Sequence, residues 1–216
     1  MNEKIKKQLY KIAEERQTKN DPLHDFQHIL RVTNLAVKIG KSAKADLEII
    51  IPAALFHDTV VYRKDDTKSK YETDESAEMA EQILKKIKGY PRGKIDKVKT
   101  CILECSFTKG IMPKLLESKV LQDADRLEST GTIAIMRGCS SSGLMNRQLY
   151  DPKDPFCKNG LEGDHSSVWL FYKRYLMIEK TIHTAFAKKI AKRRTKFLRD
   201  FLRELKLELV ESDIKV

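Results

Sequence analysis

The chain has 216 residues, 41% of them hydrophobic, and carries 42 Lys and Arg against 31 Asp and Glu. This length allows one domain with a substantial core, and no apolar run reaches the roughly 20 residues that a transmembrane helix needs. The N-terminal segment, Met-Asn-Glu-Lys-Ile-Lys-Lys, lacks the apolar stretch of a secretory signal. We therefore expect a cytoplasmic protein that does not enter a membrane, and the net charge of +11 favours anionic partners.

The four cysteines form no Cys-x-x-Cys pair, and we expect all of them to be free thiols in a reducing compartment. They are Cys101, Cys105, Cys139 and Cys157.

Apolar residues recur at the helical period along most of the chain. The expected helices cover residues 1–19, 21–40, 46–58, 73–88, 94–106 and 113–137, and two more lie within 166–209 and are divided near 181–184. Asp21 and Pro22 are suited to the start of the second helix, and Thr73 or Asp74 to the cap of the fourth. Pro52 should kink the third helix or restart it, and Gly131 should interrupt or bend the sixth.

No segment alternates with the period of a strand, so we predict an all-α bundle of about seven to nine helices. It should form a single domain over residues 1–216, with a core over 20–137 on which the helices of 166–209 pack. Two polar connections interrupt the pattern, a lysine-rich loop at 63–71 and an irregular segment at 140–163. An irregular segment of that length is typical of a lid or a binding loop.

Three of the expected helices each place His or Asp side chains next to apolar residues. His24 and His28 share one helical face, His57-Asp58 follows a buried-looking run, and Asp123 and Asp125 lie in a later helix. Each has an ordinary structural explanation alone, since a lone buried histidine is more often a packed core residue than a ligand. Together, imidazoles and carboxylates suit a divalent ion among Mn, Mg, Fe, Co, Ni and Zn.

The ordered set of these residues, with its flanking sequences, resembles the HD superfamily of metal-dependent phosphohydrolases. The similarity includes Ala-Ala-Leu-Phe-His-Asp at 53–58 and Gln-Asp-Ala-Asp-Arg-Leu-Glu at 122–128, and extends over about residues 20–209. It is strongest to the small single-domain bacterial and archaeal members, a group that includes deoxynucleoside-triphosphate pyrophosphohydrolases.

The resemblance implies four metal ligands, which are His28, His57, Asp58 and Asp125. It also implies that Arg126, the basic residue after the last ligand, contacts a substrate phosphate. Asp123 is then a residue that supports the ligands. No histidine lies between Asp58 and Asp125, so we expect one metal ion and not the two of some HD phosphodiesterases.

Other catalytic residues are less well defined by the sequence. Some HD proteins carry an acidic or lysine residue three or four positions after the pair, where this chain has Val61 and Tyr62. The candidates for a general acid or base are His24, Asp25, Asp65 and Glu72, alongside the ligands Asp58 and Asp125. Further candidates for phosphate contacts are Arg63, Lys64 and Lys173.

Three functions stay open on the sequence alone. The first is hydrolysis of (deoxy)nucleotide phosphates by metal-activated water, the second a phosphodiesterase acting on cyclic nucleotides or RNA ends, and the third a non-catalytic nucleotide- or RNA-binding module. The lysine- and arginine-rich run at 188–196 is typical of a solvated helix face, with only Phe186 and Phe197 as nearby aromatics. We therefore favour a phosphorylated small molecule over nucleic acid as the partner, and structural roles for His165 and His183.

Overall fold

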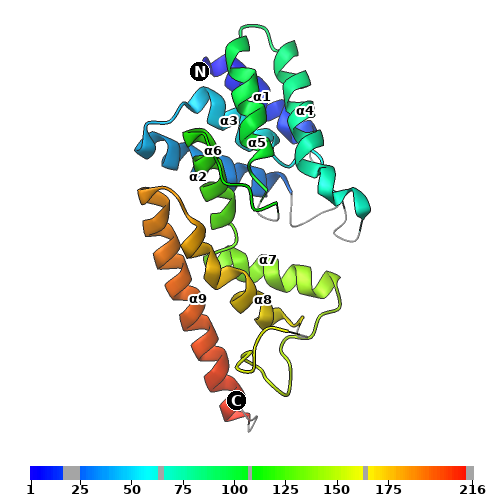
Figure 1. Ribbon diagram of the computed structural model, residues 1–216, viewed down its shortest axis with the longest axis vertical. Coiled ribbons are helices and arrows are strands. Elements are labelled where there is room, and N and C mark those ends of the chain that lie inside the picture. The colour runs from blue at the N-terminus through cyan, green and yellow to red at the C-terminus, as the bar shows by residue number, and fades with distance from the viewer. Residues whose placement is uncertain (17–24, 63–65, 107–108, 163–164, 213–216) are drawn as a thin grey trace. The chain divides into compact units, whose positions relative to one another are not determined.

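The structure is a computed structural model that describes residues 1–16, 25–62, 66–106, 109–162 and 165–212 (Figure 1). Within these ranges it contains nine α-helices, three short 3-10 helices and no strand, which confirms the all-α prediction. The chain forms two compact units, Met1–Asp125 and Arg126–Val216. A single domain with its core over 20–137 stays a prediction.

The first unit contains six α-helices, the last of which extends two residues beyond it. They are α1 (Glu3–Arg16), α2 (Phe26–Ala43), α3 (Leu47–Phe56), α4 (Glu72–Lys86), α5 (Ile95–Leu103) and α6 (Leu116–Leu127), with 3-10 helices η1 (Thr67–Tyr71) and η2 (Arg92–Lys94).

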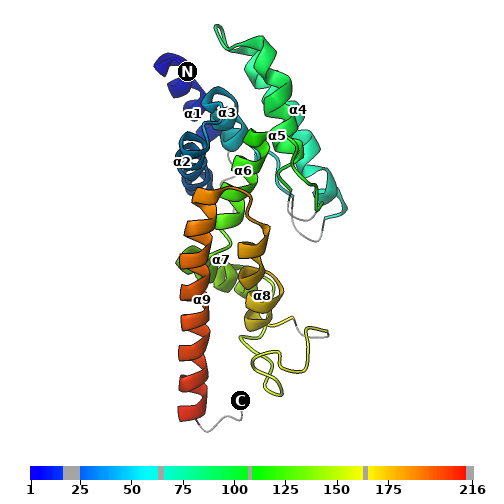
Figure 2. The ribbon, with the colours of Figure 1, turned by 60° about the vertical axis from the view of Figure 1, so that its left-hand side comes forward.

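Helix α3 forms the centre of the first unit, and every residue from Ile49 to Phe56 is buried. It packs against α1, α2, α4 and α5 (Figure 2), which explains why it is apolar on all sides and not on one face only. Asp46 caps it by accepting a 2.9 Å hydrogen bond from the Glu48 amide. The helix continues through Pro52 as one element, so it does not restart there.

Two helix starts differ in their capping from the sequence-based expectation. Helix α2 begins after Asp25, whose carboxylate accepts a 2.8 Å hydrogen bond from the His28 amide, while the expected start at residues 21–22 lies outside the described residues. The prediction that Thr73 or Asp74 caps α4 is wrong. The preceding η1 leads directly into α4, and Asp66 accepts the capping hydrogen bond of η1 instead.

The second unit contains α7 (Gly131–Leu144), α8 (Ser167–Lys173), the 3-10 helix η3 (Tyr175–Thr181) and α9 (Ala185–Glu211). The predicted division near 181–184 is confirmed between η3 and α9. The predicted irregular segment begins later than expected, because α7 continues to Leu144. The buried core of this unit consists of Ala134, Phe156, Val168, Phe171, Tyr175, Leu198, Leu202 and Leu209.

Two arginines bind backbone carbonyl groups around the end of α6. Arg126 Nη1 donates a 2.6 Å hydrogen bond to the Thr181 carbonyl, and Arg194 Nη1 donates a 2.8 Å hydrogen bond to the Leu127 carbonyl. These contacts join the last turn of α6 to η3 and α9 within the second unit.

No described helix is both long enough and apolar enough to cross a membrane. None of the four cysteines is in a disulfide, as predicted, and Cys101 and Cys105 are buried whereas Cys139 is exposed.

Gly131, the first residue of α7, has a left-handed backbone conformation whose contribution to stability can be tested. Its φ is +67°, and an added Cβ would lie 3.1 Å from Arg194 Cγ. A left-handed conformation costs an ordinary L-residue about 1–2 kcal/mol. We therefore expect Gly131→Ala to lower the free energy of unfolding by at least about 1 kcal/mol, measured by urea denaturation.

Gly143 in the same helix is the matched control. An added Cβ there meets no atom within 4 Å, and alanine is the better helix former by about 0.5–1 kcal/mol. Gly143→Ala should leave stability unchanged or raise it. Equal effects of the two substitutions would contradict the role given to the φ of Gly131.

Candidate metal centre

His57 directly follows the buried helix α3 and is itself buried, with only 3% of its surface exposed. Its Nδ1 atom lies 2.8 Å from the Ala54 carbonyl oxygen. A carbonyl can only accept, so Nδ1 carries the proton and the lone pair of a neutral ring is on Nε2. A hydrogen bond of this kind fixes ring orientation and tautomer in metal-binding histidines.

His28 approaches the same point from α2. It lies on the buried face of that helix beside Ile29 and Val32 and is 1% exposed. The centres of the two imidazole rings are 5.6 Å apart. Both rings reach this position because α2 packs directly on α3.

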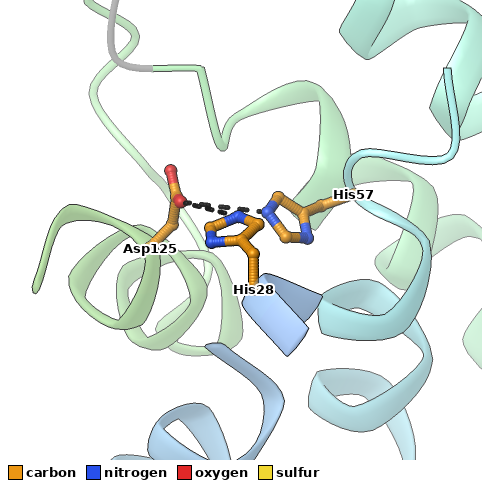
Figure 3. Close-up of side chains that lie close together, drawn as sticks. All are labelled: His28, His57 and Asp125. Carbon is orange, nitrogen blue, oxygen red and sulfur yellow. Dashed lines mark ion pairs between the residues drawn. The ribbon is translucent and has the colours of Figure 1, made fainter. Parts of the chain in front are cut away.

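The carboxylates of Asp58 and Asp125 complete the cluster. Asp58 Oδ2 lies 3.5 Å from His28 Nε2 and 3.4 Å from His57 Nε2. Asp125, on α6, places Oδ1 at 3.7 Å and 3.9 Å from the same two atoms (Figure 3). The structure thus brings together all four predicted ligands, from the two helices α2 and α6 and from the residue pair after α3.

These distances fit side chains that surround an ion better than side chains bonded to each other. They exceed the usual 2.7–3.2 Å of a hydrogen bond, and His57 Nε2 is buried without a hydrogen bond in the described part of the chain. One potential ligand atom each from His28, His57 and Asp125 lies within 4.8 Å of the others. Ligands about 2.1 Å from a common ion would be separated by roughly 3.0–3.5 Å, slightly less than observed.

The electrostatics of the cluster favour positive charge at its centre. Burial lowers the pKa of His57, but the carboxylates of Asp58 and Asp125 outweigh burial and raise that pKa above its ordinary value. Burial raises the pKa of Asp125, but His57 and His28 outweigh it and hold that pKa below the ordinary range. A cation at this point would interact with two carboxylates in a setting partly removed from water.

The other predicted site residues are placed as follows. His24, Asp65, Arg63 and Lys64 lie outside the described residues. Asp25 caps α2, and Lys173 is exposed on α8 in the second unit. Arg126 is 9% exposed, with Nη1 bonded to the Thr181 carbonyl and 3.2 Å from His183 Nε2. Asp123 is fully buried.

Two supporting contacts were not expected from the sequence. The Ala54 carbonyl that orients His57 is a backbone atom, and no residue type reveals it. Gln122 is fully buried on α6, and its amide donates hydrogen bonds to the backbone carbonyls of Glu104 and Ile111. The sequence feature that could have predicted this contact is a glutamine among apolar residues one turn before Asp125, because a buried amide requires hydrogen-bond partners.

Comparison with known proteins agrees with this geometry. The HD domain family matches residues 25–130. YpgQ of Bacillus subtilis, a protein described as uncharacterized, is 30% identical over 195 residues, which are 88% of this chain and 86% of YpgQ. The chain belongs to the HD superfamily of hydrolases.

Solved structures of HD proteins share the whole fold. The crystal structure of YpgQ in complex with ADP has a TM-score of 0.71 at 27% identity and covers 95% of both chains. An HD-superfamily hydrolase from Bacillus thuringiensis has a TM-score of 0.71 at 25% identity, over 95% of this chain and 96% of that one. This HD hydrolase is accordingly a metal-dependent phosphohydrolase, and the four converging side chains lie within the matched family region.

Metal affinity should depend on pH in a defined direction. A metal ion can bind His57 Nε2 only when that atom carries no proton, and the pKa of His57 is raised. We expect Mn²⁺ affinity to increase from about pH 6 to about pH 8, with release of a proton on binding. Isothermal titration calorimetry in two buffers of different ionisation enthalpy measures both quantities.

His165→Ala is the control, because His165 is an exposed histidine in the second unit. It should leave the proton release and the pH dependence unchanged, whereas His57→Ala should remove both along with most of the affinity. An affinity that is constant over this pH range would contradict a protonated His57 in the metal-free protein.

Proposed function

We propose that this HD hydrolase cleaves the phosphate groups of (deoxy)nucleotides, with one divalent metal ion held by His28, His57, Asp58 and Asp125. The observation that carries the proposal is the convergence of two Nε2 atoms and two carboxylate oxygens at one point. Binding of ADP by the related YpgQ supports a nucleotide as substrate. The net charge of +11 favours an anionic substrate in general.

The donor set suits a catalytic ion. Two neutral imidazoles and two carboxylates carry a charge of −2, which a divalent ion would balance, and the set suits Mn, Mg, Fe, Co, Ni or Zn. When bound, such an ion would lower the pKa of a coordinated water from about 15.7 towards about 7 and polarise a phosphoryl oxygen.

The protein side chains give the centre a buried side and an open side. The side chains of His28 and His57 are at most 2% exposed, whereas those of Asp58 and Asp125 retain 28% and 29%. Substrate and water therefore approach from the carboxylate side. Asp58 and Asp125 are then placed to hold the ion and to accept a hydrogen bond from the attacking water, while the histidines hold the ion from behind.

The proposed phosphate contacts are Arg63, Lys64, Arg126 and Lys173. Positive side chains would stabilise the charge on the equatorial oxygens during displacement. Arg126 follows Asp125 directly, and because its Nη1 is bonded to the Thr181 carbonyl, a phosphate contact would use another guanidinium nitrogen. His24 and Asp25 are the proposed acid–base residues, and Asp25 would combine that role with capping α2.

The test is a metal-supplemented assay with a panel of nucleoside mono-, di- and triphosphates, in which released phosphate and pyrophosphate are quantified separately. Loss of residues that merely support metal ligands already costs 10–100-fold in metal affinity or activity. We therefore expect His57→Ala and Asp58→Ala each to lower kcat/KM by more than about 100-fold and to lower the bound metal in elemental analysis.

Asp96→Asn serves as the matched control, since this carboxylate is exposed on α5. It should retain activity and metal content. Full activity in the His57 or Asp58 variant would refute the proposed centre. Preference for a cyclic or diester substrate over every nucleotide in the panel would keep the centre and replace the substrate class.

A further inference from the structure

The N-terminal half of α9 carries a concentration of positive charge that helix formation does not explain. Seven basic residues occur from 188 to 199 with no acidic residue among them. They are Lys188, Lys189, Lys192, Arg193, Arg194, Lys196 and Arg199. Like charges three and four residues apart destabilise a helix, and its dipole favours anions at this end. Local rules are commonly broken in this way at functional sites.

Most of these cations lie on one face, together with two exposed aromatic rings. Ala187, Ala191 and Leu198 form the buried side of this half of the helix. The exposed basic residues lie away from it and are Lys188, Lys189, Lys192, Arg193, Lys196 and Arg199. Phe186 and Phe197 are 36% and 45% exposed. They are eleven residues apart, which is about three turns, so their rings lie on the same side about 16 Å apart.

Few acidic side chains neutralise this basic–aromatic face, which we define as the six exposed cations with Phe186 and Phe197. Asp200 pairs with Lys196 at 2.8 Å, and Glu179 lies 3.9 Å from Arg199. The other four cations have no ion pair within the described part of the chain. The C-terminal half of α9 differs, because its basic residues alternate with acidic ones from 203 to 211.

A surface hollow of about 490 Å³ adjoins Phe197. From α9 it is lined by Phe197, by three cationic side chains and by one carboxylate, which are those of Arg193, Arg194, Lys196 and Asp200. Residues 130–133 line it from the start of α7. The hollow therefore combines an exposed ring with cationic side chains and is large enough for a nucleobase and its phosphate.

We propose that the basic–aromatic face of α9 binds single-stranded nucleic acid. Lysine and arginine side chains along a helix face match a row of phosphates, and exposed rings provide surfaces on which bases stack without sequence preference. The distance between the two rings equals the length of about five stacked nucleotides. This surface belongs to the second unit and does not depend on the proposed nucleotide hydrolysis at the metal centre.

The placement of apolar residues favours nucleic acid over a lipid surface. A helix that lies on a membrane offers its broad apolar face to the acyl chains. The apolar face of α9 is instead buried in its own unit, where Leu198, Leu202 and Leu209 are part of the core. Only Phe186 and Phe197 remain among the exposed cations, which is the pattern of a stacking surface.

The test measures fluorescence anisotropy of a labelled uridine or thymidine oligonucleotide of about 15 residues with the full-length protein, in chelator so that the strand stays intact. We expect log K to fall with log[salt] with a slope of about −3, as for four phosphate contacts. Phe186→Leu and Phe197→Leu should each weaken binding about fivefold or more, because leucine keeps the apolar volume and removes the ring. The triple change Lys189→Gln, Lys192→Gln and Arg193→Gln should make the slope shallower by about 2.

Lys206→Gln is the matched control, an exposed lysine on the mixed-charge half of α9, and should change binding less than twofold. His57→Ala should bind as the unaltered protein does, and loss of binding in that variant would assign the strand to the metal centre and overturn the proposal. Absence of binding at low salt, or unchanged affinity in both leucine variants, would also overturn it. Binding to phosphatidylserine-containing vesicles in place of the oligonucleotide would assign the face to a membrane surface.

Discussion

The structure depends on the free-energy cost of burying polar side chains. In α3 and the helices packed on it, this cost is offset by hydrogen bonds and by the convergence of polar groups. An unbonded imidazole or carboxylate is expensive away from water. His57 is held at the end of a helix that is buried on all sides, and its Nδ1 is satisfied by the Ala54 carbonyl. This hydrogen bond fixes the orientation of the ring, so that Nε2 faces the carboxylates. The packing of the hydrophobic centre of the first unit thereby sets the geometry of the candidate metal centre.

The same argument applies to α6, which carries Asp125, the last of the four proposed ligands. Gln122 is buried and is satisfied by the chain between α5 and α6, and this fixes the helix that carries Asp125. Immediately after Asp125 the chain enters the second unit, where Arg126 is bonded to the Thr181 carbonyl. A proposed ligand and a proposed phosphate contact are thus adjacent in sequence, while their supporting hydrogen bonds come from different units.

The two units use charge differently. In the first, two carboxylates and two imidazoles converge at one largely buried point, an arrangement that suits a small cation. In the second, like charges are spread along an exposed helix face with aromatic rings among them, which is the requirement for an extended anion. The excess of positive charge in the composition is therefore not evenly distributed over the protein. Part of it is concentrated on one face of α9.

The helical fold and most helix positions could be predicted from the sequence, because helical periodicity is a local property. The set of four converging residues came from the resemblance of their flanking sequences to the HD superfamily, because spacing alone did not separate Asp125 from Asp123. The sequence also placed the division between η3 and α9 correctly. The predicted cap of α4 was wrong, because the preceding η1 leads directly into that helix, and the predicted end of α7 was too early. The tertiary structure was needed to show that His28, His57, Asp58 and Asp125 converge. It was also needed to show that a backbone carbonyl sets the tautomer of His57, and that two phenylalanine rings of α9 are exposed beside the cations. Those outcomes follow from packing between segments far apart in the chain, which no local pattern encodes.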